Sequence, residues 1–208
     1  MKTLFLTSQF KNMVKELKAV LPKPANELSC AFIPTAADVY EEKPWMYADR
    51  DELIKLGLNV FDLPLKGKTK QEIEEALSNV DIIFVAGGNT FYLLDEARKS
   101  GFVEIIPKLV EKGVIYIGSS AGSYLACPTI EAATWKNQDK NIIGMTDFTA
   151  LNLVPFILFV HYKPEHNDLL KQEIPKTKYP VRILKDDQAI LVLDNKYKFV
   201  GQSEEIKI

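Results

Sequence analysis

The sequence predicts an α/β protein: a three-layer sandwich with a mostly parallel central sheet, helices on both faces, and short antiparallel strands at the C-terminal end. Two observations carry this prediction. Short apolar runs alternate with amphipathic stretches as far as residue 117, and beyond Pro128 an irregular region is followed by closely spaced short β patterns. With 208 residues, 47% of them hydrophobic, the chain is expected to form one domain over residues 1–208.

The first part of the chain alternates strands and helices. Apolar residues recur at helical spacing from Phe10 until Pro22, and Glu72 three residues after Thr69 forms a capping-box pattern. The run 80–85 is almost continuously apolar, as in a strand buried on both faces. The predicted strands are 3–6, 31–34, 58–61, 80–85 and 114–117, and the predicted helices are 10–21, 45–56, one from 69, one from 89, and 102–112.

The last third follows another pattern. Residues 129–150 are polar and irregular, 151–160 are apolar, and 168–173 form a short helical segment. Short β elements are expected at 181–184, 189–193, 199–200 and 205–208, where they extend the sheet in antiparallel fashion.

Composition excludes several classes of function. The net charge is −2, and the 26 basic and 28 acidic residues are interspersed, so nucleic-acid and membrane partners are not expected. The first apolar stretch is too short for a signal peptide or a membrane span, which predicts a cytoplasmic protein. Cys30 and Cys127 lack the spacing of a zinc site or a small disulfide fold and are expected in the core; no metal and no cofactor are predicted.

The motif Gly118-x-Ser120-x-Gly122 is the strongest indication of chemistry. It follows a predicted strand and precedes an apolar run, which is the strand–turn–helix context of a nucleophile elbow. The glycines allow a sharp turn that exposes the Ser120 hydroxyl. Ser119 is the weaker candidate because it does not lie between the glycines, and the motif also occurs by chance in ordinary turns.

A serine nucleophile needs a base, and the sequence contains two histidines. His161 ends an apolar run, whereas His166 lies in a polar loop; His161 is favoured because a rigid element must hold a base. A carboxylate is expected to orient the imidazole. Asp139 is the first choice, with Glu131 and Asp147 left open.

A second turn, Gly87-Gly88-Asn89-Thr90, follows the predicted strand 80–85. Adjacent glycines let backbone N–H groups approach a bound group, so the N–H groups of Gly88 and Ala121 are predicted as oxyanion donors. Asn89 is expected to contact the substrate. A phosphate-binding turn or plain tight packing is the alternative, but a P-loop is excluded because no Gly-Lys-Ser/Thr follows.

Five blocks of sequence lie in a fixed order around these residues. They are Gly87-Gly88-Asn89-Thr90-Phe91-x-Leu93-Leu94, Gly118-x-Ser120-Ala121-Gly122, Ala126-Cys127-Pro128-Thr129-Ile130, Ala150-Leu151-Asn152-Leu153-x-Pro155 and His161. In order and approximate spacing the chain resembles the peptidase E (aspartyl dipeptidase) family, which is related to cyanophycinase and similar in fold to class I glutamine amidotransferases. The resemblance covers nearly the whole chain.

The resemblance implies a serine peptidase with nucleophile Ser120, base His161 and oxyanion donors Gly88 and Ala121. It places the third catalytic member in the loop after Ile130. The family's Asn-Asp-Met-Pro sequence is missing from that loop here, and Asp139 is the nearest match.

The resemblance also bears on specificity. The family selects an N-terminal aspartate with an arginine soon after the histidine, and residues 161–174 contain no arginine. Lys163 and Lys171 carry the positive charge there, and a lysine does not reproduce the bidentate guanidinium fork. The sequence therefore gives no support for strict Asp-X specificity and leaves another small peptide open as substrate.

The predicted function is a serine-dependent hydrolase that cleaves short peptides through an acyl-enzyme. The alternative is a catalytically silent binding or sensing protein that kept the fold. Amidotransfer would require a cysteine where Ser120 stands. The expected partners are a small peptide substrate and, as an option, a second copy of the chain in a homodimer.

Overall fold

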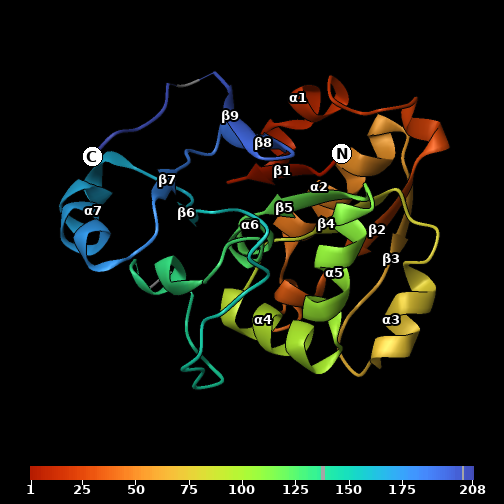
Figure 1. The fold of residues 1–208 in the computed structure, drawn as a ribbon, viewed down its shortest axis with the longest axis horizontal. Coiled ribbons are helices and arrows are strands. Elements are labelled where there is room, and N and C mark those ends of the chain that lie inside the picture. Colours follow the sequence, from red (N-terminus) through yellow and green to blue (C-terminus); the bar gives the residue numbers. More distant parts are fainter. Residues whose placement is uncertain (137–138, 203) are drawn as a thin grey trace.

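A seven-stranded sheet forms the centre of the molecule (Figure 1). The computed structural model describes residues 1–136, 139–202 and 204–208. The strand order across the sheet is β3-β2-β4-β5-β1-β8-β9. The strands are β1 (Thr3–Thr7), β2 (Ser29–Ile33), β3 (Asn59–Asp62), β4 (Ile82–Val85), β5 (Ile115–Ser119), β8 (Gln188–Leu193) and β9 (Lys196–Gly201).

The sheet is mostly parallel, as predicted. The five strands from β3 to β1 pair in parallel, whereas β8 runs antiparallel to β1 and β9 antiparallel to β8. Register aligns Thr7 of β1 with Ser119 of β5, and Val85 of β4 with Gly118. The carboxyl ends of β1, β4 and β5 therefore lie together at one edge, near the start of β8.

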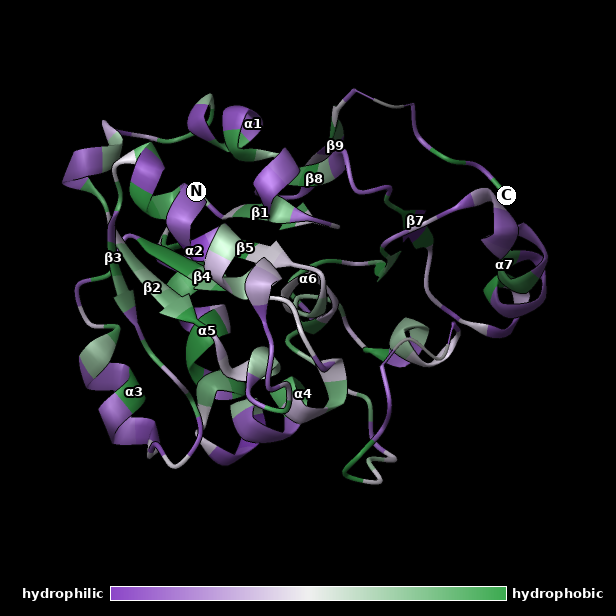
Figure 2. Cartoon of the chain, turned by 180° about the vertical axis from the view of Figure 1, so that it is seen from behind, coloured by the Kyte–Doolittle hydropathy of each residue, from purple (hydrophilic) through white to green (hydrophobic). Residues whose placement is uncertain are grey.

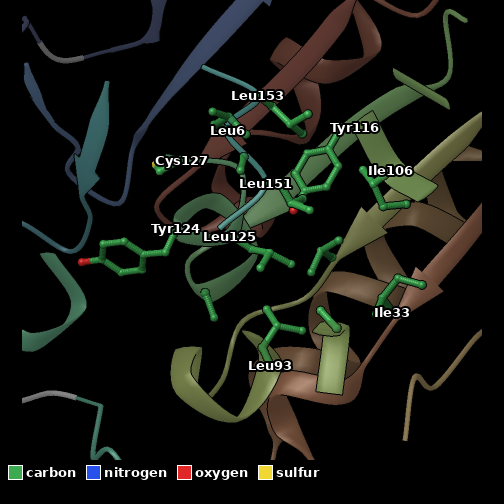
Figure 3. Close-up of a cluster of buried hydrophobic side chains, with 14 of the residues drawn as sticks. Leu6, Ile33, Leu93, Ile106, Tyr116, Tyr124, Leu125, Cys127, Leu151 and Leu153 are labelled. Atoms are coloured by element: carbon green, nitrogen blue, oxygen red, sulfur yellow. The ribbon is translucent and has the colours of Figure 1, made fainter. Parts of the chain in front are cut away.

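Helices cover both faces of the sheet. One face packs against α1 (Val14–Lys18) and α2 (Pro44–Leu56), around a core that includes Phe84. The other packs against α3 (Lys70–Ala76), α4 (Thr90–Lys99), α5 (Phe102–Glu111) and α6 (Ala121–Leu125). Figure 2 shows hydrophobic strands at the centre and hydrophilic stretches on the outer helices, and Figure 3 shows core side chains such as Leu6, Leu93 and Tyr116.

Local signals in the sequence account for several helix ends. The side chain of Thr69 accepts from the N–H of Glu72, whose carboxylate accepts from the N–H of Thr69, so the predicted capping box is confirmed. The predicted helix 10–21 is divided into a 3₁₀ turn and α1. The 3₁₀ helices are Phe10–Asn12, Ala25–Glu27, Thr35–Ala37, Glu131–Thr134, Pro164–His166 and Ile174–Lys176.

The C-terminal part differs from the expectation at two points. β6 (Ile157–Phe159) and β7 (Val181–Ile183) form a separate two-stranded parallel sheet, which lies with α7 (Asn167–Glu173) at one side of the molecule (Figure 1). The prediction that 181–184 extends the main sheet antiparallel is therefore wrong. Residues 204–208, which the structure describes, form no strand, so the β element expected at 205–208 is also wrong.

Two smaller findings concern the cysteines and the helices. Cys30 and Cys127 are free and buried, as predicted. Among the helices in the described part of the chain, none is long and apolar enough to cross a membrane.

Candidate active site

Ser120 lies on a sharp turn between β5 and α6. Its backbone angles, φ 50° and ψ −105°, fall outside the regions that a serine ordinarily adopts. Such strain persists only where surrounding contacts enforce it. The Ser120 N–H donates to the carbonyl of Thr7 at 3.0 Å, which ties the turn to the end of β1.

Gly122 allows α6 to start against the sheet. A Cβ at this position would lie 2.1 Å from the carbonyl oxygen of Val85 in β4. Only a residue without a side chain permits this approach, because the opposing atom is backbone and cannot rotate away. The second glycine of the motif thus positions the helix that begins immediately after Ser120.

A Gly122→Ala variant should therefore lose both stability and activity. We expect overpacking to lower the free energy of unfolding by about 1–3 kcal/mol and to displace the start of α6. Urea unfolding and a turnover assay measure the two effects. Gly144→Ala is the control: an added Cβ there meets nothing within 4 Å and only its φ of 65° opposes the change, so activity should stay near wild type. Wild-type stability and activity in Gly122→Ala would contradict this account.

His161 reaches Ser120 from the segment after β6. Its Nε2 lies 2.9 Å from the Ser120 Oγ. The His161 backbone has φ 55°, and its N–H donates to the Ser8 Oγ at 2.8 Å. Lys136 supports the same segment by donating from Nζ to the carbonyl of Val160 at 2.6 Å. The histidine is held by contacts from two other parts of the chain, whereas Nδ1 of His166 accepts from the N–H of Lys163 at 3.0 Å.

Asp186, just before β8, is the carboxylate that contacts His161. Its Oδ1 lies 2.6 Å from His161 Nδ1 and accepts from the Ser8 hydroxyl at 2.7 Å. The hydrogen bond with His161, together with that of Ser8, holds the pKa of Asp186 below its usual value despite partial burial. An ionised carboxylate can only accept, so Nδ1 carries the proton and Nε2 of the neutral ring can accept from Ser120.

Asp139, the first choice from the sequence, does not occupy that position. Its Oδ2 accepts from the N–H of Thr90 at 3.0 Å and from the Thr90 hydroxyl, at the start of α4. Burial raises the pKa of Asp139, in contrast to Asp186. The assignment of Asp139 as the partner of His161 is corrected by this geometry: Asp186 makes the contact.

The two other carboxylates considered from sequence also lie elsewhere. Asp147 pairs with Arg98 at 3.1 Å, and Glu131 opens the 3₁₀ helix Glu131–Thr134. Neither bonds to His161 within the described residues. The three candidates all lie between the serine and the histidine, whereas the carboxylate that contacts His161 comes 25 positions after the histidine.

The predicted oxyanion donors lie beside the serine. Gly88 has φ 151°, and a Cβ there would lie 2.2 Å from the carbonyl oxygen of Ala36. Ala121 opens α6, where the first N–H groups have no partner within the helix. No hydrogen bond joins either N–H to another described residue, so both can receive a substrate oxygen.

Asn89 has a structural role at the start of α4. Its Oδ1 accepts from the N–H of Tyr92, which caps α4, and its Nδ2 donates to the carbonyl of Lys140 at 2.9 Å. The side chain is 3% exposed. Its polar atoms are thus used within the protein, and the expectation that Asn89 contacts substrate stays a prediction.

A cavity of about 300 Å³ opens onto the Ser120–His161 pair. It is small for a ligand site, since such pockets span roughly 300–1,000 Å³. Among the described residues, no group of three or more His, Cys, Asp or Glu side chains is placed to hold a metal ion. The lining residues are Ser8, Gln9, Lys11, Tyr40, Trp45, Asp49, Gly87, Gly88, Ser119, Ser120, Asp139 and His161.

Ser8, Asp49 and Asp186 are polar residues of the site that were not predicted from the sequence. The sequence does contain a signal for Asp186. Asp186 and Asp187 directly precede an apolar run. If that run pairs antiparallel with the first strand, its beginning meets the carboxyl edge where Ser120 lies. No comparable signal marks Ser8 or Asp49.

At the carboxyl edge of this sheet, hydrogen bonds connect a serine to a histidine and the histidine to a carboxylate. This is the arrangement of serine hydrolases. Comparison with known proteins is more specific. The model of peptidase family S51 matches residues 4–200, so the chain belongs to this family and is a serine peptidase.

Similar proteins come from several bacteria. The chain is 37% identical to the uncharacterized peptidase Lmo0363 of Listeria monocytogenes, over 78% of each chain, and 34% identical to the uncharacterized peptidase PM1590 of Pasteurella multocida, over 96% of this chain and 97% of that one. It is 36% identical to peptidase E of Salmonella arizonae, over 70% of this chain and 62% of the relative.

Solved structures confirm the fold. A Listeria monocytogenes EGD-e crystal structure, described as a candidate peptidase E, superposes with a TM-score of 0.86 at 30% identity, covering 98% of this chain and all of that one. A peptidase from an acI-B1 actinobacterium superposes with a TM-score of 0.70 at 16% identity, over 98% of this chain and 88% of that one, which is a likeness of fold alone.

Proposed function

We propose that the protein hydrolyses short peptides through a Ser120–His161–Asp186 triad and an acyl-enzyme intermediate. The observation that carries the proposal is the pair of contacts on one imidazole: 2.9 Å to Ser120 on Nε2 and 2.6 Å to Asp186 on Nδ1. Membership of a peptidase family and a small cavity at the serine support it.

In the first half of the reaction, the Ser120 hydroxyl gives its proton to His161 Nε2 as Oγ attacks the peptide carbonyl carbon. The carbonyl oxygen becomes an oxyanion that accepts from the N–H groups of Gly88 and Ala121. His161 then gives the proton to the peptide nitrogen, the C–N bond breaks, and the amine product leaves. The acyl group remains on Ser120 as an ester.

In the second half, water attacks the ester. His161 takes a proton from the water, the oxyanion forms again, and its collapse breaks the bond to Oγ. His161 returns the proton to Ser120 as the acid product leaves. Asp186 stays ionised throughout, keeps the proton of the neutral ring on Nδ1, and stabilises the imidazolium in both halves.

The substrate class follows from the cavity and from the residues near His161. The cavity's volume suits a peptide of a few residues. We do not propose strict Asp-X specificity, because residues 161–174 contain no arginine. The test is a screen of dipeptides and tripeptides varied at the first residue, with released amine as the readout. Hydrolysis of at least one series is expected. A folded protein that binds peptides without cleaving any would be the binding or sensing protein instead.

A further inference from the structure

Asp49 is a carboxylate of the cavity wall that the proposed reaction leaves unused. It lies on α2 and is 3% exposed. Its Oδ2 accepts from the Ser119 hydroxyl at 2.8 Å, and the carboxylate also accepts from the N–H of Lys11. Since Ser119 directly precedes Ser120, this hydrogen bond fixes the Asp49 carboxylate against the residue before the nucleophile.

This carboxylate has hydrogen bonds but no ionic partner. No charged nitrogen of a lysine, arginine or histidine among the described residues lies within 4.0 Å of the Asp49 carboxylate, and the Lys11 ammonium attracts it only from a longer distance. Burial raises its pKa to about 6, so near neutral pH it is mostly ionised although the site disfavours its charge. A desolvated anion of this kind is stabilised by a cation that enters the cavity.

The charges near Asp49 favour the same ligand. Lys136 lies in the adjoining hollow with Asp139 and attracts that carboxylate, whereas the side chain of Lys11, the ammonium that lines the cavity with Asp49, is exposed. A further anion beside Asp49 would meet repulsion, and a cation there would balance its charge. In a short peptide, the cation nearest the first peptide bond is the α-ammonium, two covalent bonds from the carbonyl carbon that Ser120 would attack.

We propose that Asp49 binds a positively charged nitrogen of the peptide's first residue and thereby selects such peptides over those that lack this charge. The inference rests on the proposed peptidase function. The nitrogen comes either from the α-ammonium or from a basic side chain, and the two sources share the same chemistry at Asp49.

Peptide binding to the Ser120→Ala variant tests this without turnover. Calorimetry compares Ala-Leu with N-acetyl-Ala-Leu, and Lys-Leu with norleucyl-Leu. We expect the charged member of one pair to bind about 30-fold more tightly, and Asp49→Asn in the same background to remove most of that preference. A preference within the first pair identifies the α-ammonium, and one within the second identifies the side chain.

Asp81→Asn is the matched control. Asp81 also accepts from a serine hydroxyl and a backbone N–H, both of Ser29, but it lies at the start of β4 and outside the cavity. Asp81→Asn should leave both preferences intact.

Equal binding within both pairs, or preferences that survive Asp49→Asn, would overturn the inference. If Asp49→Asn does not fold, Asp49→Ser in the same background replaces it, with the same expected loss of preference. Binding of charged peptides by a wild type that cleaves none would contradict the proposed function and leave this inference standing.

Discussion

Ser120→Ala should lower kcat/KM for peptide hydrolysis by about 10⁶-fold, to the background of the assay. Without the hydroxyl no acyl-enzyme can form, and the oxyanion donors and the base cannot replace it. The fold should persist, because the Ser120 contact with Thr7 runs through its backbone N–H. Thermal unfolding and steady-state hydrolysis on the same samples measure both expectations.

Ser119→Ala is the control for this experiment. The two serines are adjacent, but the Ser119 hydroxyl donates to Asp49 and is 2.8 Å from it, whereas that of Ser120 faces His161. The loss in Ser119→Ala should therefore be far smaller. Retained activity in Ser120→Ala together with a large loss in Ser119→Ala would show that Ser119, not Ser120, is the nucleophile.

Asp186→Asn should lower kcat by about 10⁴-fold. The amide of asparagine can donate to Nδ1, which favours the tautomer with the proton on Nε2, and that nitrogen can then no longer accept from Ser120. The two contacts of Asp186, to His161 and to Ser8, keep the substituted side chain in place. Nitrogen chemical shifts of the imidazole would report the tautomer alongside the rate.

The parallel variant Asp139→Asn separates the two carboxylates that sequence and structure favour. Asp139 accepts from Thr90 at the start of α4, so its replacement should mainly affect the loop that carries it. We expect a loss of less than about tenfold, because no proton transfer of the reaction passes through it. If Asp139→Asn lost as much activity as Asp186→Asn, the assignment of Asp186 would be wrong.

Most of the fold could be predicted from the sequence because local patterns determine it. Buried parallel strands such as Ile82–Val85 are continuous apolar runs, and the capping box at Thr69 marks the start of a helix. The pairing of Val181–Ile183 could not be predicted, because a strand of three residues is too short for its sequence pattern to indicate which strand it pairs with. Its parallel pairing with β6 depends on tertiary packing.

Some residues of the site could likewise be predicted from local sequence, and others could not. Ser120 and Gly88 belong to turns with distinctive local sequences, and His161 was one of two histidines. Asp49 has no such local sequence, and the position of Asp186 before an apolar run points to the site only once the antiparallel pairing of that run is known. Asp186 reaches the site because β8 runs antiparallel to β1, and Asp49 is buried because the 3₁₀ turn Phe10–Asn12 packs over α2. Both depend on contacts between segments far apart in the chain.

Labelling with a fluorophosphonate tests the central claim, an activated Ser120, most directly. The reagent phosphonylates a serine whose hydroxyl is deprotonated by a neighbouring base, and mass spectrometry of the digested protein locates the adduct. The account predicts one adduct, on Ser120, formed rapidly by the wild type and far more slowly by His161→Ala and Asp186→Asn. A folded wild-type protein that forms no adduct on Ser120, or forms it at the same rate without His161, would contradict it.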